Sequence, residues 1–200
     1  MKIVVIYCHP SEKSYTHEMY TNLKSTLLRE NLAFEVLDLY AMNFQTDMTE
    51  EEYEREGFAN VTLPIPEDVV EQHQKLESAD CLIFMYPVWW SDCPAKLKGW
   101  FDRVYSVGYA YGYNESSTIE KMKPKKYGLV ICTAGHPNEF LEEIGIAQSM
   151  KNVMIDDRLG KRFLNKEMII LGGTLDKDHV RPKHLEIIAS IGRNIKEYCA

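Results

Sequence analysis

Five short segments of this sequence are apolar along most of their length, and each is bounded by turn residues. They cover residues 2–7, 34–39, 82–86, 127–133 and 168–171. Short apolar runs of this kind are typical of strands that are covered on both faces, as in a parallel sheet. The second segment, FEVLDL, alternates more than the others between apolar and polar residues. The pattern predicts a buried sheet that is mostly parallel.

Helical patterns separate these strands and follow the last of them. Apolar residues recur at helical spacing within residues 16–31, 66–78, 94–105, 139–159 and 183–198. Strands that alternate with helices form right-handed βαβ units and a doubly wound α/β sheet. Five strands favour the flavodoxin-like order 2-1-3-4-5. Because 200 residues fit one hydrophobic core, we expect residues 1–200 to form a single domain of this kind.

Two connections are too long to be plain turns. Residues 40–65 include an acidic patch, and residues 106–123 are rich in glycine and tyrosine. Long loops in compact domains are usually binding or association elements. We therefore expect both loops to contribute to a site or an interface.

Composition excludes several classes of function. The 30 acidic residues outnumber the 23 basic ones, giving a formal charge of −7, which argues against nucleic acid as a partner. No segment approaches the roughly 18–20 apolar residues of a membrane span, so membrane insertion is not expected. The five cysteines have no paired metal-ligand spacing. Their odd number, without a disulfide-like framework, predicts a cytoplasmic protein without a metal site.

The loop after the first predicted strand leads directly into a helix. Free backbone N–H groups and the positive end of the helix dipole make such a position suitable for a phosphate. Ser14 and Thr16 add hydroxyl groups, and His9 and Lys13 can add positive charge. The loop contains neither GxGxxG nor a Walker motif. Ser14 or Thr16 is equally well explained as a helix N-cap, and His9 as a structural histidine.

The loops after the third and fourth predicted strands face the same edge of such a sheet, where ligands bind. Residues 87–91 include the adjacent Trp89 and Trp90, which can form a wall for a planar ring such as a flavin. The alternative is that both are core aromatics. In the other loop, Gly135 permits close approach of the backbone, and His136 is either a proton donor or an ordinary surface histidine. Together with the first loop, they predict a flavin nucleotide site.

Several motifs resemble those of the flavodoxin-fold NAD(P)H:quinone oxidoreductases, which include DT-diaphorase, bacterial quinone reductases and potassium-efflux ancillary proteins. They are HPSEKSYT at 9–16, DLYAMNF at 38–44, the stretch 69–105, GYAYGY at 108–113 and, more weakly, TAGH at 133–136. The block YPxxW…PAxLKGWFDRV within 69–105 is the most specific. The resemblance covers residues 1 to about 140 and is loose beyond residue 145.

The resemblance implies a two-electron hydride transfer from NAD(P)H through bound FAD or FMN to a quinone or related acceptor, by a ping-pong mechanism. It assigns flavin phosphate contacts to His9, Ser14, Tyr15 and Thr16. It assigns isoalloxazine contacts to Pro87, Val88, Trp89, Trp90, Thr133, Ala134 and Gly135. The family is dimeric, and the resemblance implies that Tyr111 and Tyr113 complete the site of the partner in a homodimer.

One departure from the family concerns proton transfer. The tyrosine and histidine that relay protons to the flavin in one family member align with Phe140 and Ile146. Neither residue can donate a proton. The catalytic candidate is then His136, unless water takes the role or the reduced flavin stays anionic.

Two other functions fit the sequence. One is a flavodoxin-like electron carrier without enzymatic activity, although the tryptophan-rich and tyrosine-rich loops speak against it. The other is a flavin-binding regulatory subunit of a membrane transporter.

Overall fold

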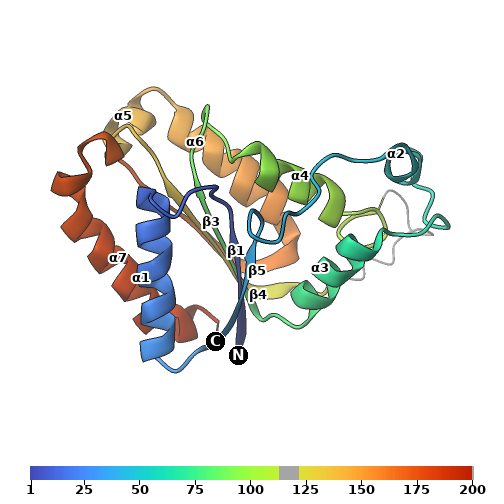
Figure 1. The fold of residues 1–200 in the computed structure, drawn as a ribbon, viewed down its shortest axis with the longest axis horizontal. Helices are drawn as coiled ribbons and strands as arrows, with labels where there is room; N and C mark the ends of the chain where they lie inside the picture. The colour runs from blue at the N-terminus through green and yellow to red at the C-terminus, as the bar shows by residue number, and fades with distance from the viewer. Residues whose placement is uncertain (113–121, 200) are drawn as a thin grey trace.

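The structure is a computed structural model that describes residues 1–112 and 122–199. Its centre is a five-stranded sheet in the order β2-β1-β3-β4-β5, with every neighbouring pair parallel (Figure 1). The order predicted from the sequence is therefore confirmed. The strands are β1 (Lys2–Tyr7), β2 (Ala33–Asp38), β3 (Cys81–Pro87), β4 (Lys125–Thr133) and β5 (Phe163–Leu171).

Helices cover both faces of the sheet, which explains why the inner strands β1, β3 and β4 are apolar along most of their length. On one face, α1 (Tyr15–Arg29) and α7 (Lys177–Tyr198) lie side by side (Figure 1). They meet so closely that a Cβ built on Gly192 would lie 2.1 Å from Thr26 Cγ2. On the other face, α4 (Ala95–Val104) buries Leu97, Trp100 and Phe101 against the sheet. Every residue of the central strand β3 is consequently buried.

The predicted helices 16–31, 66–78 and 94–105 are observed as α1, α3 (Glu67–Glu77) and α4, with ends shifted by one or two residues. The helix expected at 139–159 is wrong as a single element. It is divided into α5 (Asn138–Glu143), α6 (Ile146–Lys151) and the π-helix η1 (Asn152–Leu159). The break lies at Gly145, whose φ of 76° is the left-handed conformation that glycine adopts readily.

Two other elements begin five or six residues earlier than predicted, because their outer residues are polar or exposed. Strand β5 begins at Phe163 rather than at residue 168, and the early part of this edge strand is mostly solvent-exposed. The continuous apolar run at residues 168–171 therefore identifies only the more buried, C-terminal part of β5. Helix α7 begins at Lys177 rather than at 183 and continues through Pro182. Short 3-10 turns, η2 (Gly160–Arg162) and η3 (Thr174–Asp176), flank β5.

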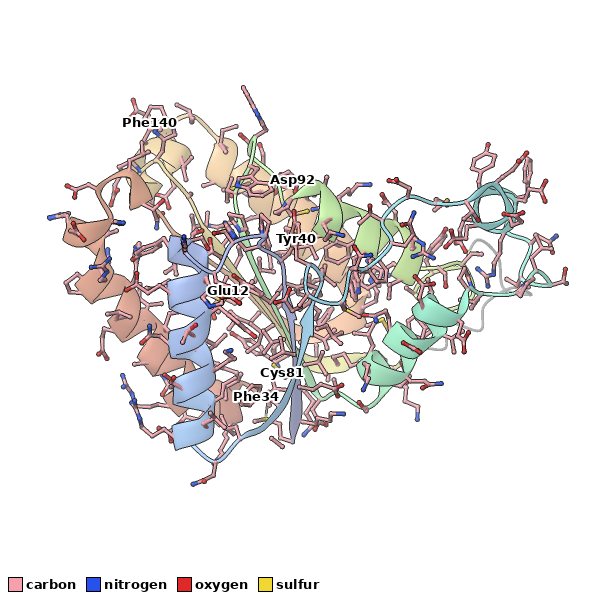
Figure 2. The ribbon with its side chains drawn as sticks, viewed as in Figure 1. Glu12, Phe34, Tyr40, Cys81, Asp92 and Phe140 are labelled. Carbon is pink, nitrogen blue, oxygen red and sulfur yellow. The ribbon has the colours of Figure 1, made fainter. Side chains whose placement is uncertain are left out.

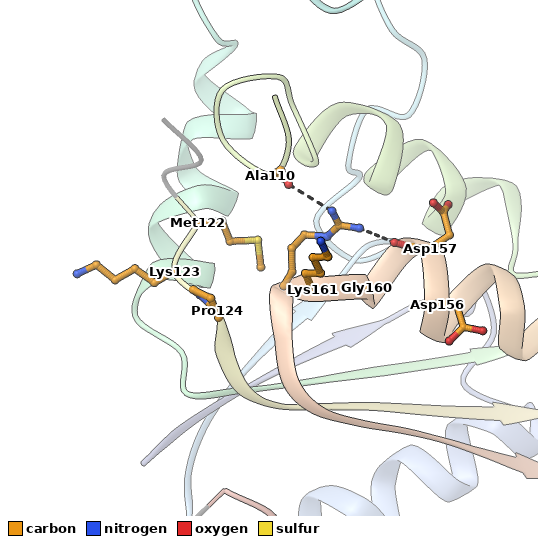
Figure 3. A pocket seen from close by; sticks show the side chains of 9 residues that line it. Ala110, Met122, Lys123, Pro124, Asp156, Asp157, Gly160 and Lys161 are labelled. Carbon is orange, nitrogen blue, oxygen red and sulfur yellow. Dashed lines mark hydrogen bonds between the residues drawn. The ribbon is translucent and has the colours of Figure 1, made fainter. Parts of the chain in front are cut away.

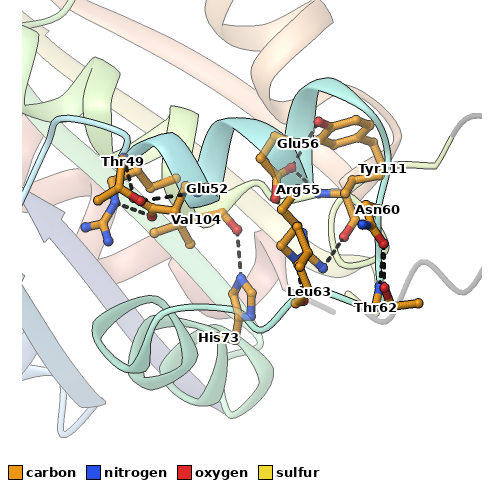
Figure 4. A network of polar contacts seen from close by, with 12 residues as sticks. Thr49, Glu52, Arg55, Glu56, Asn60, Thr62, Leu63, His73, Val104 and Tyr111 are labelled. Atoms are coloured by element: carbon orange, nitrogen blue, oxygen red, sulfur yellow. Dashed lines mark hydrogen bonds and ion pairs between the residues drawn. The ribbon is translucent and has the colours of Figure 1, made fainter.

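The long loop 40–65 contains a helix that the sequence did not reveal, α2 (Glu50–Gly57). A reciprocal capping box begins it: the Thr49 N–H donates to Glu52 at 2.8 Å, and the Glu52 N–H donates to Thr49 Oγ1 at 3.2 Å (Figure 4). The Nε of the buried Arg103, in α4, donates to Glu52 at 2.7 Å. This ion pair fixes α2 against the body of the protein. In the described part of the chain, no helix combines the length and apolarity needed to cross a bilayer.

Candidate active site

Three loops come together at the carboxyl ends of β1, β3 and β4. In Figure 2, Asp92, Tyr40 and Phe140 lie toward this edge of the sheet, whereas Phe34 and Cys81 mark the opposite end. The hydroxyl oxygens of Thr16 and Thr133 are 2.7 Å apart and buried, which ties the start of α1 to the end of β4. The ring of His9 packs edge-on against Trp89, with ring centroids 5.9 Å apart, and so ties the first loop to the second. The predicted convergence of the loops is therefore observed.

The first loop prepares the amino terminus of α1 for an anion. Ser14 is the N-cap, and its hydroxyl accepts a hydrogen bond from the His17 N–H at 3.0 Å. In the described part of the chain, the backbone N–H groups of Tyr15 and Thr16 donate to no protein acceptor. Free N–H groups at a helix amino terminus are suited to a phosphate. Ser14 can therefore be the N-cap of α1 in a loop that also binds phosphate, because capping by its hydroxyl leaves the N–H groups of Tyr15 and Thr16 available.

His9 contributes a hydrogen-bond donor to this loop rather than a positive charge. Burial lowers the pKa of His9, a trend that the Ser11 contact only partly opposes. The imidazole is therefore neutral at pH 7. Its Nδ1 accepts the Ser11 N–H at 3.0 Å, so the ring proton lies on Nε2.

Tyr15 has a side chain directed away from the first loop. Its hydroxyl hydrogen-bonds Nδ1 of His184 in α7 at 2.8 Å. Burial raises the pKa of Tyr15 to about 12, so the phenol stays protonated at neutral pH. Tyr15 can therefore contact a phosphate through its backbone but not through its hydroxyl.

The second loop is a strained reverse turn that carries Trp90 at its tip. Trp89 and Asp92 exchange backbone hydrogen bonds of 2.9 and 3.2 Å, while Trp90 and Ser91 have φ of 49° and 64°. Two successive positive φ values define a turn that normally contains Asn or Gly, and a bulky residue there is strained. Trp89 is 42% exposed and Trp90 is fully exposed. The alternative that both tryptophans belong to the core is thus wrong, since the core tryptophan is Trp100.

A cavity of about 240 Å³ lies between the second and third loops. It is lined by Val88, Trp90, Ser91, Ala134, Gly135, His136, Leu141 and Ile146. The sequence did not single out Leu141. Ile146 was recognised only as a replacement for a proton donor, and it supplies part of the apolar wall.

The third loop offers a free backbone donor and an exposed imidazole. In the described residues, the N–H groups of Trp90 and Gly135 have no hydrogen-bond acceptor. Those of Val88 and Ala134 are used within the fold, at 2.8 and 3.0 Å. His136 is exposed, and its ring lies 4.8 Å from that of Phe140.

Pro87 supports the cavity from within the sheet rather than lining it. It is the last residue of β3, is buried and pairs with Thr133 of β4.

A second cavity, of about 310 Å³, lies beside the first loop. It is lined by Tyr7, His9, Pro10, Glu12, His17, Asp38, Tyr40 and Ala41. Asp38 at the end of β2 accepts the N–H groups of Tyr40 and Ala41 at 3.1 and 3.0 Å. Of these residues, the sequence assigned a flavin contact to His9 alone; Asp38 received no role, although it opens a motif on which the family resemblance rests.

Tyr111 lies far from these cavities in the fold of one chain. Its hydroxyl donates to Glu56 of α2 at 3.2 Å (Figure 4). Tyr113 lies outside the described residues. A further cavity of about 400 Å³, which includes Arg162 and Ala110, lies near the amino ends of β4 and β5 (Figure 3). It is therefore at the opposite end of these strands from the three loops.

The residues present fit a flavin nucleotide. The exposed indole of Trp90 offers a face for stacking, and two free N–H groups, those of Trp90 and Gly135, can meet the polar edge of a ring. The free N–H groups of Tyr15 and Thr16 can meet a phosphate. Backbone donors for an anion beside an aromatic face are the recognition elements that a flavin nucleotide requires.

Comparisons with known proteins agree with this geometry. The model of the flavodoxin-like fold family matches residues 1–164. The structure of an NAD(P)H:quinone oxidoreductase from Methanothermobacter marburgensis superposes with a TM-score of 0.89 at 44% identity, covering 98% of this chain and 97% of that one. An uncharacterized NAD(P)H oxidoreductase of Haemophilus influenzae is 29% identical over 157 residues, which are 78% of this chain and 75% of the relative. NAD(P)H dehydrogenase [quinone] 1 of Rattus norvegicus is 33% identical over 147 residues, or 67% of this chain and 54% of the rat protein. The chain therefore belongs to the flavodoxin-like fold family and, within that fold, to the NAD(P)H:quinone oxidoreductases.

Proposed function

We propose that this protein is a flavin-dependent enzyme that transfers hydride from NAD(P)H to a quinone or a related acceptor. The observation that carries the proposal is the fully exposed Trp90, held on a strained turn across a cavity from Gly135. Exposed aromatic surface and backbone strain both cluster at functional sites. The relatives named above supply the reaction class.

The chain's own residues divide the work of binding between two ends of the site. Tyr15 and Thr16 would hold the phosphate through their N–H groups. Trp90 would stack against the flavin ring, while its N–H and that of Gly135 fix the polar edge. A bound flavin would supply the hydride-transfer chemistry between nicotinamide and acceptor, and these residues would supply placement and electrostatics.

The cavity wall limits water and leaves one side chain for proton transfer. Leu141 and Ile146 line the cavity with apolar surface. His136 is the titratable side chain in the same lining, and its exposed ring can exchange protons with solvent. We assign proton transfer to His136 because Phe140 and Ile146 carry no exchangeable side-chain proton.

We further propose that the protein works as a cytoplasmic homodimer. The cavity of about 240 Å³ is smaller than the roughly 300–1,000 Å³ typical of ligand sites, which is consistent with a site completed by a second subunit. Tyr111 and Tyr113 would supply that surface to the partner. The free cysteines, all five of them buried, are compatible with a reducing compartment.

The test is to purify the protein, record its visible spectrum and identify the released chromophore by chromatography. This separates FMN from FAD, between which the cavity does not discriminate. Steady oxidation of NADH or NADPH in the presence of menadione would identify the donor and would exclude a simple electron carrier. A colourless protein that binds neither flavin would refute the proposal.

A further inference from the structure

The turn that presents Trp90 is attached to the body of the protein by a paired set of charged hydrogen bonds. Arg158 Nη1 donates to Asp92 Oδ1 at 2.8 Å, and Nη2 donates to Oδ2 at 3.0 Å. The same carboxylate accepts the Cys93 N–H at 2.7 Å. Partial burial alone would raise the pKa of Asp92, but these hydrogen bonds hold it below its usual value. The carboxylate is therefore ionised at neutral pH.

Arg158 is placed for this contact and is largely withdrawn from solvent. It is 8% exposed, and its guanidinium lies 5.3 Å from the centroid of the Phe101 ring. Its Nη1 also contacts Met154 Sδ at 3.0 Å and Cys93 Sγ at 3.4 Å. A buried guanidinium among sulfur and aromatic atoms depends on its carboxylate partner for charge compensation. The planar fork matches both carboxylate oxygens, which a lysine cannot do.

Arg158 comes from η1, the segment where the expected α-helix is replaced by a π-helix. Departures of this kind are rare and often occur at functional sites. This π-helical segment places Arg158 beside Asp92, the last residue of the tryptophan turn, although the two residues are 66 positions apart in the sequence.

The tip of the turn has little else to hold it. Trp90 and Ser91 are exposed, so their side chains contribute little packing. Both have positive φ, a conformation that persists only where the surroundings determine it. Besides the two backbone hydrogen bonds of the turn and the contact between Trp89 and His9, the charged pair holds the turn against η1.

We propose that Asp92 and Arg158 are positioning residues that fix the Trp90 turn in the orientation needed to stack on the flavin. The inference rests on the proposed flavin site and deepens it. Without the pair, the turn would sample other conformations, and each binding event would have to order it again. The pair would thereby set flavin affinity without touching the flavin.

Variants of Asp92 give the most direct test, because this residue is partly exposed and its loss does not open a core cavity. We expect Asp92→Ala to raise the flavin dissociation constant at least about tenfold, or about 1.4 kcal/mol. Asp92→Asn keeps one oxygen acceptor and should have a smaller effect. Asp102→Asn is the matched control, since Asp102 forms an exposed pair with Lys98 on α4. Affinity is measured by quenching of flavin fluorescence on titration into apoprotein.

Variants of Arg158 test whether the fork geometry matters. Arg158→Lys keeps the charge but loses the paired contact, so we expect it to resemble Asp92→Ala and not to restore binding. If Arg158→Met fails to fold, the Asp92 and Arg158→Lys variants still decide the question. The visible circular dichroism of bound flavin provides a second measurement, because a looser stack changes the asymmetry around the ring.

Three outcomes overturn the inference. The first is that folded Asp92 and Arg158 variants bind flavin with wild-type affinity and give a wild-type dichroism spectrum, even if their melting temperature falls. In that case the pair has only a structural role, and the proposed function stands. The second is an Arg158→Lys variant that binds flavin with wild-type affinity. The third is a wild-type protein that binds no flavin, which refutes the proposed function together with this inference.

Discussion

Replacing Trp90 by glycine should stabilise the apoprotein while it weakens flavin binding. The side chain of Trp90 is fully exposed and φ is 49°, so the residue contributes strain without burial. Glycine occupies this region of φ without a steric cost. The usual expectation that losing a tryptophan destabilises a protein is therefore reversed at this position.

The size of the gain follows from two opposing terms. A non-glycine residue in the left-handed region costs roughly 1–2 kcal/mol. Glycine loses more backbone entropy on folding, which takes back roughly 0.4–1 kcal/mol. Taking the middle of each range, the net gain is about 0.8 kcal/mol in the free energy of unfolding. For a chain of this size that is a rise of about 1–4 °C in melting temperature.

Flavin affinity should move in the opposite direction. A stacked aromatic ring contributes roughly 0.5–1.5 kcal/mol beyond burial. Covering about 100 Å² of the indole contributes roughly 2–3 kcal/mol more. Loss of both terms, roughly 2.5–4.5 kcal/mol together, raises the flavin dissociation constant by a factor of about 10² to 10³. Turnover measured at limiting flavin should fall with it.

Trp90→Ala is the matched control, because alanine keeps the Cβ and the strained φ but removes the ring. We expect its unfolding free energy to stay within about 0.5 kcal/mol of wild type and its flavin affinity to fall as in Trp90→Gly. The assay combines calorimetry of both apoproteins with flavin titration. A destabilised Trp90→Gly would mean that the turn is not strained, and unchanged affinity in both variants would mean that Trp90 does not stack on the cofactor.

Three further predictions concern the supporting structure. Gly192→Ala should lower the free energy of unfolding by roughly 1–3 kcal/mol, because the added Cβ overpacks against Thr26 Cγ2. The loss should be smaller in a Thr26→Ser background, which lacks that methyl group. A double-mutant cycle measured by urea denaturation tests this. Thr133→Val should cost roughly 1–3 kcal/mol, measured the same way, by leaving the buried Thr16 hydroxyl unpaired; a neutral effect would contradict the pairing. Burial, reinforced by nearby Lys183, lowers the pKa of His184, so the unfolded state binds more protons and wild-type stability should fall as pH drops below about 6.5. His184→Asn should flatten this dependence in melts from about pH 7 to pH 5, and an equally steep curve would exclude His184 as its source.

The parts of the fold that follow from the sequence are those whose burial is uniform. Strand β3 is covered on both faces, so its uninterrupted apolar run identified it. The polar first half of β5 lies at the sheet edge and carries no such signal. Helix α2 was missed because it is rich in acidic residues and is held by an ion pair between Glu52 and Arg103 rather than by an apolar stripe.

The candidate site was predictable where it depends on strand ends and not where it depends on side-chain direction. The three loops follow from the order of strands, and their residues meet as expected. The sequence predicted Trp90 as a wall of the site, but its full exposure at the tip of a strained turn depends on the φ values of the turn, which the sequence does not show. The pairing of Asp92 with Arg158 joins residues 66 positions apart through a π-helix that has no simple sequence signature.

The most direct test of the central claim is to follow the visible absorption of the purified protein under anaerobic conditions while NADH or NADPH is added, followed by a quinone. We expect a flavin spectrum that one equivalent of the nicotinamide bleaches and that the quinone restores. We also expect that apoprotein of Trp90→Ala, supplied with the same flavin concentration, gives a smaller response. A wild-type protein whose bound flavin is not bleached by either nicotinamide would contradict the account.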